Sequence, residues 1–161
     1  MWREMKEIMR ALSSCYGELL KISEAKHKAL AAMDLKALER VVKTEEGFAS
    51  RIEQLEARRK VALQALADRE KAIEPTMKLR DLCALCPDKH LARELEMLHE
   101  ELDRRMKEVE RVGENNTLLA ESALAAVTAN LNRIGGTTAG TSYGAGGKES
   151  VTRTRRFDFK A

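Results

Sequence analysis

The stretch that decides the fold is DKHLARELEMLHEELDRRMKEVERVGENNTLLAESALAAVTANLNRI, residues 88–134. Apolar and small side chains recur in it at alternating steps of three and four, which is typical of a coiled-coil seam. Asp88 precedes them, and its short carboxylate can accept hydrogen bonds from the amides of a first helical turn. The stretch therefore predicts one helix of about 70 Å. Its seam comprises Leu91, Leu95, Leu98, Leu102, Val109, Val112, Asn116, Leu119, Ala123, Ala126 and Asn130.

Two further long helices are predicted upstream, over about 3–33 and 35–73, because apolar residues keep helical spacing there. Asp34 is the predicted N-cap of the second helix. Glu74 and Pro75 are predicted to end that helix, since a residue before proline is pushed out of the helical region.

A short connecting helix is predicted over 76–85, with apolar side chains that can plug one end of a bundle. We therefore expect an all-α fold in which residues 1–134 form an elongated antiparallel three-helix bundle or coiled coil. Residues 135–161 are expected to form a flexible, disordered C-terminal tail rich in Gly, Ser and Thr. The plug residues are Met77, Leu79, Leu82 and Leu85.

The composition favours a helical protein over a sheet protein. The chain has 161 residues, 34% charged and 43% hydrophobic, with two prolines. The N-terminus MWREMKEIMR is charged and periodic, unlike a signal peptide, and no apolar run is long enough to span a membrane. We expect a soluble, cytoplasmic protein without membrane insertion, whose three cysteines are reduced thiols.

The net charge of +3 lies in the tail. Residues 135–161 hold five basic and two acidic residues, so the 24 basic and 24 acidic residues that remain elsewhere cancel. A neutral body lacks the basic stripe of a typical duplex-binding domain, and we expect no nucleic-acid partner. The glycine-rich stretch gives Tyr143 nothing of its own to pack against, so Tyr143 is either incidental or a ligand for another molecule.

The apolar pattern changes over the last four turns of the third long helix. Its strongest apolar residues move one position along from the seam, to Leu124, Val127, Leu131 and Ile134. One residue is about 100° of rotation, so these side chains are predicted to point away from the upstream seam as an exposed amphipathic stripe. The alternative interpretation is that the bundle supercoil or the turn between the first two helices covers them.

No enzymatic arrangement stands out, and we expect neither catalysis nor a cofactor. Acidic residues are paired with bases at helical spacing, which favours a solvated surface. Cys83 and Cys86, followed by His90, could share a zinc ion, but a fourth ligand is missing unless His99 reaches back. Cysteine is often a small buried hydrophobe, so no metal site is predicted. His27 is predicted to be a surface histidine.

In three places the chain resembles the FlgN family of flagellar type III export chaperones. The first is an E, L, D, x, L arrangement, and the second is the leucine, glutamate and arginine of RIEQLEARRKVAL, residues 51–63. The third is an asparagine pair and a leucine pair, followed by an amphipathic helix and a glycine-rich tail with a tyrosine. The first place comprises Glu24, Leu30, Asp34, Leu35 and Leu38, and the second comprises Leu55, Glu56 and Arg58 or Arg59. The third comprises Asn115, Asn116, Leu118, Leu119 and Tyr143.

The resemblance implies a cytoplasmic chaperone that acts transiently at the flagellar export apparatus. Such chaperones bind the helical C-terminal segments of hook-filament junction (hook-associated) proteins, keep them soluble and unassembled, and deliver them to the type III export gate. Tyr143 would dock on the cytoplasmic domain of the gate protein FlhA. The client-binding residues would be Leu118, Leu124, Val127, Leu131 and Ile134.

The chain departs from the family pattern at its end. After Tyr143 it continues into VTRTRRFDFKA, residues 151–161, which is longer and more basic than the resemblance leads one to expect. Phe157 and Phe159 are either a second anchor or part of a charged terminus.

Two other hypotheses stay open at the level of sequence. A coiled-coil adaptor would form a stable homodimer through the third-helix seam, with Asn116 fixing the register. A nucleic-acid binder would use the arginines and aromatic residues of the tail, and its binding would weaken strongly with salt. For the chaperone we expect a monomer or a weak homodimer.

Overall fold

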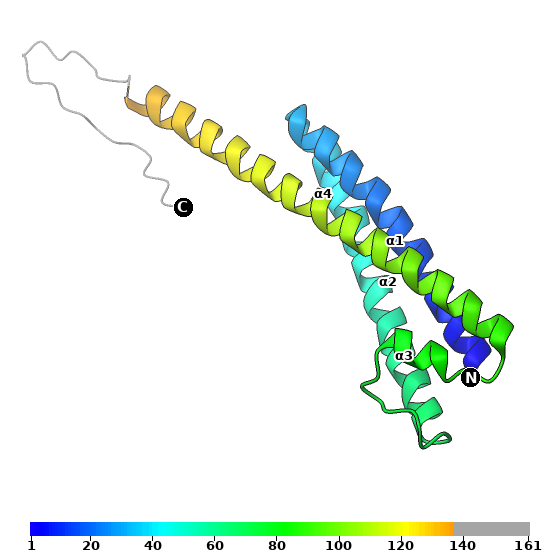
Figure 1. Ribbon diagram of the computed structural model, residues 1–161. Helices are drawn as coiled ribbons and strands as arrows, with labels where there is room; N and C mark the ends of the chain where they lie inside the picture. Colours follow the sequence, from blue (N-terminus) through cyan, green and yellow to red (C-terminus); the bar gives the residue numbers. More distant parts are fainter. Residues whose placement is uncertain (137–161) are drawn as a thin grey trace, which may run out of the picture. The chain divides into compact units, whose positions relative to one another are not determined.

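The computed structural model describes residues 1–136, and these residues form helices and turns without a strand (Figure 1). The predicted all-α helical fold is therefore confirmed. Residues 137–161, with Tyr143 and nearly all of the predicted tail, lie outside the described residues. No helix within 1–136 is long and apolar enough to cross a membrane. The helices are α1 (Trp2–Ala31), α2 (Leu35–Ala67), α3 (Leu79–Ala84) and α4 (Lys89–Gly136).

The chain divides into two compact units, Met1–Thr117 and Leu118–Ala161. The first unit contains α1, α2, α3 and the first part of α4, and the second contains the remainder of α4. The division after Thr117 lies N-terminal to the domain boundary that the sequence predicts at 134/135. That predicted boundary stays a prediction. The two units are described separately below.

A tight turn makes α1 and α2 antiparallel. Met33 adopts a left-handed conformation (φ 54°) after the end of α1, and the amide of Asp34 donates to the Ala29 carbonyl at 3.0 Å. This is the Schellman arrangement that satisfies the last carbonyls of a helix. Asp34 then caps α2 by accepting from the Ala37 amide at 2.9 Å, as predicted. Further along the pair, Lys26 contacts Glu45 at 2.6 Å.

The first part of α4 runs parallel to α1. Contacts between the two helices occur in the same order along both. Lys6 pairs with Glu94 at 3.1 Å near their starts, and Asn116 donates to the Ser23 carbonyl at 2.8 Å further along. In Figure 1 α1, α2 and this part of α4 lie side by side. Asp88 begins α4 by accepting from the amides of His90 and Leu91, as predicted, and these hydrogen bonds lower the pKa of its carboxyl group.

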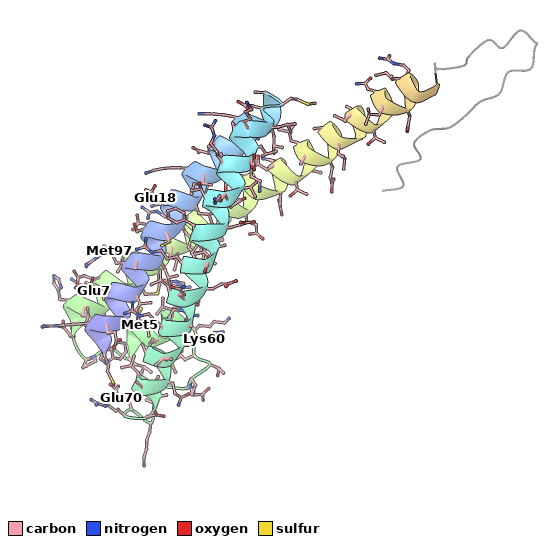
Figure 2. All side chains as sticks on the ribbon, turned by 180° about the vertical axis from the view of Figure 1, so that it is seen from behind. Met5, Glu7, Glu18, Lys60, Glu70 and Met97 are labelled. Atoms are coloured by element: carbon pink, nitrogen blue, oxygen red, sulfur yellow. The ribbon has the colours of Figure 1, made fainter. Side chains whose placement is uncertain are left out.

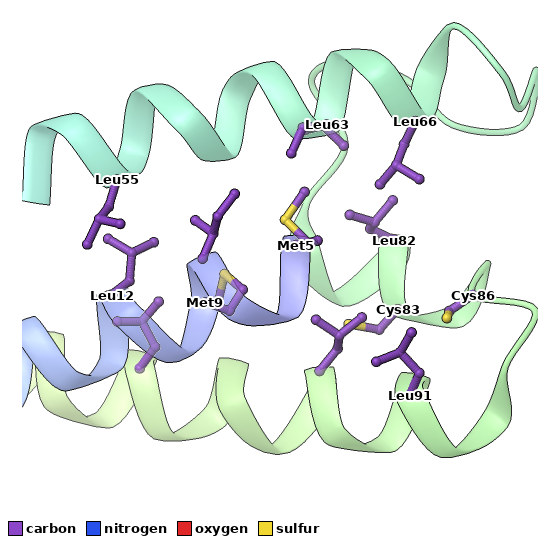
Figure 3. Packing of buried hydrophobic residues seen from close by; sticks show 14 of the residues in the cluster. Met5, Met9, Leu12, Leu55, Leu63, Leu66, Leu82, Cys83, Cys86 and Leu91 are labelled. Atoms are coloured by element: carbon purple, nitrogen blue, oxygen red, sulfur yellow. The ribbon is translucent and has the colours of Figure 1, made fainter. Parts of the chain in front are cut away.

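The hydrophobic core lies at the end of the first unit that holds α3. Figure 3 shows side chains of α1 facing those of α2, with α3 and the start of α4 closing the cluster. Leu82 has 1% of its surface exposed, and Met77, Leu79 and Leu85 pack around the cluster half-buried. The predicted plug is thus confirmed. The fully buried side chains are Met5, Ile8, Met9, Leu12, Leu66, Leu82, Leu95 and Cys83.

The predicted end of the second helix was wrong. α2 stops at Ala67, not at about 73, and the Asp68 amide closes it by donating to the Gln64 carbonyl. The chain then turns, and Ile73 is buried at 4% exposure from a non-helical position. The packing of the Ile73 side chain in the core therefore favours a non-helical backbone at 68–75, because tertiary packing overrides local helix propensity. Pro75 alone does not set the end of the helix.

The other helix bounds differ by a few residues from the predictions. α1 ends at Ala31 rather than 33, because residues 32 and 33 belong to the turn. α3 begins at Leu79 rather than 76. α4 continues through Gly135 to Gly136, so the predicted tail boundary at 135 falls inside a helix.

Charged side chains occupy the outer surface of the first unit. Glu7 and Glu18 on α1 and Lys60 on α2 are exposed (Figure 2). Glu7 and Glu18 each pair with a base three residues further along α1, at 2.8 and 2.7 Å. Such exposed pairs are worth only about 0.3–0.5 kcal/mol each, so the buried core stabilises this unit.

Candidate functional site

The apolar stripe of the second unit is the candidate site. Four side chains of α4 that the sequence selects are exposed in the structure: Leu124 at 64%, Val127 at 44%, Leu131 at 49% and Ile134 at 62%. In the same helix, Glu121 and Arg133 are the charged residues among 118–136, so the described part of this unit is neutral. The stripe is therefore a mainly apolar surface with little electrostatic preference.

The predicted direction of the stripe, away from the upstream seam, stays a prediction, and an ideal helical wheel gives a different direction. A repeat of 3.5 residues drifts by about 20° per heptad on a helix of 3.6 residues per turn. Between positions 95 and 130, five heptads apart, the drift amounts to about 100°, which cancels the shift of one residue. At 100° per residue, Leu124, Val127 and Leu131 fall on the same side of the helical wheel as Leu95 and its neighbours in the seam. On that ideal wheel the stripe lies on the core-type face of α4, and in the structure its four side chains are exposed.

Leu118 is separated from the rest of the predicted client-binding residues. Its side chain is 62% exposed, but it lies about 120–140° around the helix from Leu124 and Leu131. One helix face cannot present all five residues. The candidate surface therefore consists of Leu124, Val127, Leu131 and Ile134, and Leu118 belongs to another face.

An arginine occupies the seam position that the heptad pattern leaves out, between Leu102 and Val109. Arg105 donates from its Nη1 atom to the carbonyl and, at 3.0 Å, to the hydroxyl of Ser13, and it pairs with Glu101 at 2.6 Å. Gly17 leaves room for it, since a Cβ atom there would lie 3.1 Å from that nitrogen. The gap in the heptads, a serine in the α1 seam and a mid-helix glycine are the signals that could have predicted this polar layer.

A second polar layer joins α1 to α4 near the end of the first unit. Asn116 is 3% exposed, donates to the Ser23 carbonyl, and its Oδ1 atom lies 3.0 Å from Nδ1 of His27. His27 is exposed, as predicted, and its contact with Asn116 is a further feature that the sequence did not indicate. The adaptor hypothesis needs Asn116 at a homodimer seam, but its side chain is used within one chain.

The cysteine motif belongs to the core. Cys83 has no exposed surface, whereas the side chain of His90 is 86% exposed and lies 3.8 Å from Glu94. The structure therefore does not bring the three candidate zinc ligands together. Within residues 1–136, no group of three His, Cys, Asp or Glu side chains could hold a metal ion. Burial raises the pKa of the Cys86 thiol.

The Cys83 thiol gives the stability of the protein a predictable dependence on pH. Burial, with a smaller contribution from the charge of Glu96, raises its pKa from 9.0 to about 11. Between these values the unfolded chain loses the proton and the folded chain keeps it, so the free energy of unfolding should fall by up to about 2–3 kcal/mol as the pH rises from 9 to 11. Urea unfolding of the wild type and of Cys83→Ala across this range measures the difference. Equal slopes for the two proteins would contradict the raised pKa.

The comparisons with known proteins complete this description. The family model described as FlgN protein matches residues 1–150, which is most of the chain and includes every described residue. No curated protein and no solved structure matches it. With its helical bundle and its exposed apolar stripe, the chain belongs to the FlgN family of flagellar export chaperones.

Proposed function

We propose that this protein is a cytoplasmic chaperone that binds the helical C-terminal segments of hook-filament junction proteins. It keeps these clients unassembled and delivers them to the flagellar type III export gate. It acts without catalysis, cofactor or nucleic acid. Membership of the FlgN family supports the general role, and the exposed stripe of α4 supports the mode of binding.

The single observation that carries the proposal is the exposure of Leu124, Val127 and Leu131 on a core-type helix face. An amphipathic client helix would add its apolar side to that face, which is the helix-in-groove mode of recognition. Full burial of an exposed leucine or valine contributes about 1.5–3 kcal/mol, and these side chains contribute less because they are already partly covered. A few such side chains give binding that holds a client and still releases it.

The proposal is tested by retention of purified hook-filament junction proteins on the immobilised full-length chaperone at two salt concentrations. We expect retention at both, because apolar contacts are little screened by salt. Genomic DNA and total RNA serve as competitors in the same assay. Retention of nucleic acid at low salt only, without the junction proteins, would favour the nucleic-acid hypothesis instead.

Tyr143 is proposed to dock on the cytoplasmic domain of the export-gate protein FlhA. This residue lies outside the described residues, and the proposal is supported by the family resemblance of the tail. We expect Tyr143→Ala to leave client binding unchanged and to block export, because a tyrosine supplies much contact area at a small cost in rotamer entropy. Secreted junction proteins and motility measure the effect, with Tyr143→Phe as the conservative control. Normal secretion with Tyr143→Ala would remove Tyr143 from this role.

A further inference from the structure

The last eleven residues of the sequence differ in composition from the glycine-rich stretch before them. The family match ends at residue 150, and residues 151–161 read VTRTRRFDFKA. Val151, Phe157 and Phe159 are apolar, and four basic residues stand against one acidic residue. This segment therefore combines large apolar side chains with a net charge of +3, within a second unit whose described part is neutral.

The chain between α4 and residues 151–161 is long enough for this segment to reach the stripe. Residues 137–150 are fourteen residues with four glycines, and a chain of this length can span at most about 46–50 Å. Leu131 and Leu124 lie five and twelve residues before Gly136, which is about 8 and 18 Å along the helix. This maximal reach exceeds both distances, so residues 151–161 are connected closely enough to lie against the stripe of their own chain.

The chemistry of the segment also fits the end of α4. The exposed side chains of Leu124, Val127 and Leu131 can bury two phenylalanine rings, and aromatic rings bring much apolar area to a contact.

We propose that residues 151–161 bind the stripe of their own chain, on Leu124, Val127 and Leu131, when no client is present, and that a client displaces them. This inference uses the stripe as the client surface and so rests on the proposed function. The segment covers an apolar surface that would otherwise favour association between copies. Occupation by the segment also lowers the apparent client affinity by the fraction of molecules in which the stripe is covered.

The experiment compares three full-length proteins: the wild type, Phe157→Ser with Phe159→Ser, and Arg153→Ser with Arg155→Ser as the control. Methyl signals of Val127 and Leu131 are recorded by NMR without client, and a C-terminal helical peptide of a junction protein is then titrated. We expect the phenylalanine variant to shift these signals and to bind the peptide about threefold or more tightly, as the loss of an internal competitor requires. The arginine variant should change both much less.

The outcomes separate this inference from the proposed function. Unchanged methyl signals in the phenylalanine variant, with normal client binding, would overturn the inference and leave the chaperone function intact. Shifted signals without client binding in any protein would support docking of the segment and contradict the client surface. Wild-type signals that change on dilution would show that a second copy, rather than the chain's own segment, covers the stripe, and would also overturn the inference.

Discussion

Replacing Leu95 with alanine is expected to lower the free energy of unfolding by about 2–5 kcal/mol, because it removes a side chain with no exposed surface from the core of the first unit. Leu95 comes from α4 and belongs to the cluster to which α1, α2 and α3 also contribute. The surrounding helices cannot close the space completely, so the lost transfer free energy and the cavity add. Since small domains are stable by about 5–15 kcal/mol, this single change removes a large part of the total. Urea unfolding monitored by circular dichroism measures it.

The matched control is Leu124→Ala in the same helix. Leu124 is 64% exposed, so its truncation should change the free energy of unfolding by less than about 0.5 kcal/mol, as is usual for surface substitutions. The chemical change is the same in both variants, and only the burial differs. Similar losses in the two variants would mean that Leu124 is packed as tightly as Leu95, and the stripe would then be part of the core.

The existence of the helices and the starts of α2 and α4 could be predicted from the sequence because their causes are local. Asp34 and Asp88 accept hydrogen bonds from the first amides of α2 and α4, as their side chains and positions indicate. The apolar spacing identified the core side of α4, where Leu91, Leu95 and Leu102 are buried. Both signals act within a few turns of chain.

The end of α2 and the partners of the polar residues in the seam could not be predicted in the same way, because they depend on contacts far away in the sequence. Ile73 is buried from a turn by contacts with the core. Arg105 reaches Ser13, and Asn116 reaches Ser23, across about ninety residues. A single sequence shows a polar residue in a seam but does not show which backbone group satisfies it.

The exposure of the four stripe residues could be predicted from the sequence, whereas their direction around the helix depends on the exact number of residues per turn. The shift from the seam to Leu124, Val127 and Leu131 is visible in the sequence. Whether this shift rotates the apolar face depends on the accumulated difference between 3.5 and 3.6 residues per turn. The resulting rotation is about 20° over one heptad and about 100° over five heptads, which equals the rotation of one residue. Leu118 belongs to the client-binding residues that the family resemblance implies, and its angle of about 120–140° from Leu124 and Leu131 separates it from the stripe.

The Leu131→Glu substitution is expected to abolish client capture while helix content and unfolding free energy stay near those of the wild type. Leu131 is 49% exposed, so the folded protein keeps the new carboxylate in contact with water. A client helix bound there would bury that charge without a partner, which costs several kcal/mol. A loss of this size corresponds to more than about a hundredfold in affinity. Isothermal titration with a junction-protein peptide, together with circular dichroism, measures both properties.

Two variants of the same helix make this test specific. Ala129→Glu places the same charge at an exposed position about 160° from Leu131, and it should leave client binding within about twofold, because an exposed charge remote from a contact is weakly coupled to it. Leu118→Glu should behave like Ala129→Glu if Leu118 lies on another face. Equal loss of binding in all three variants would show that a general change in charge, rather than the stripe, controls capture. Unfolding caused by Leu131→Glu alone would place its side chain in the core, because burying an unpaired carboxylate there destabilises the folded state itself.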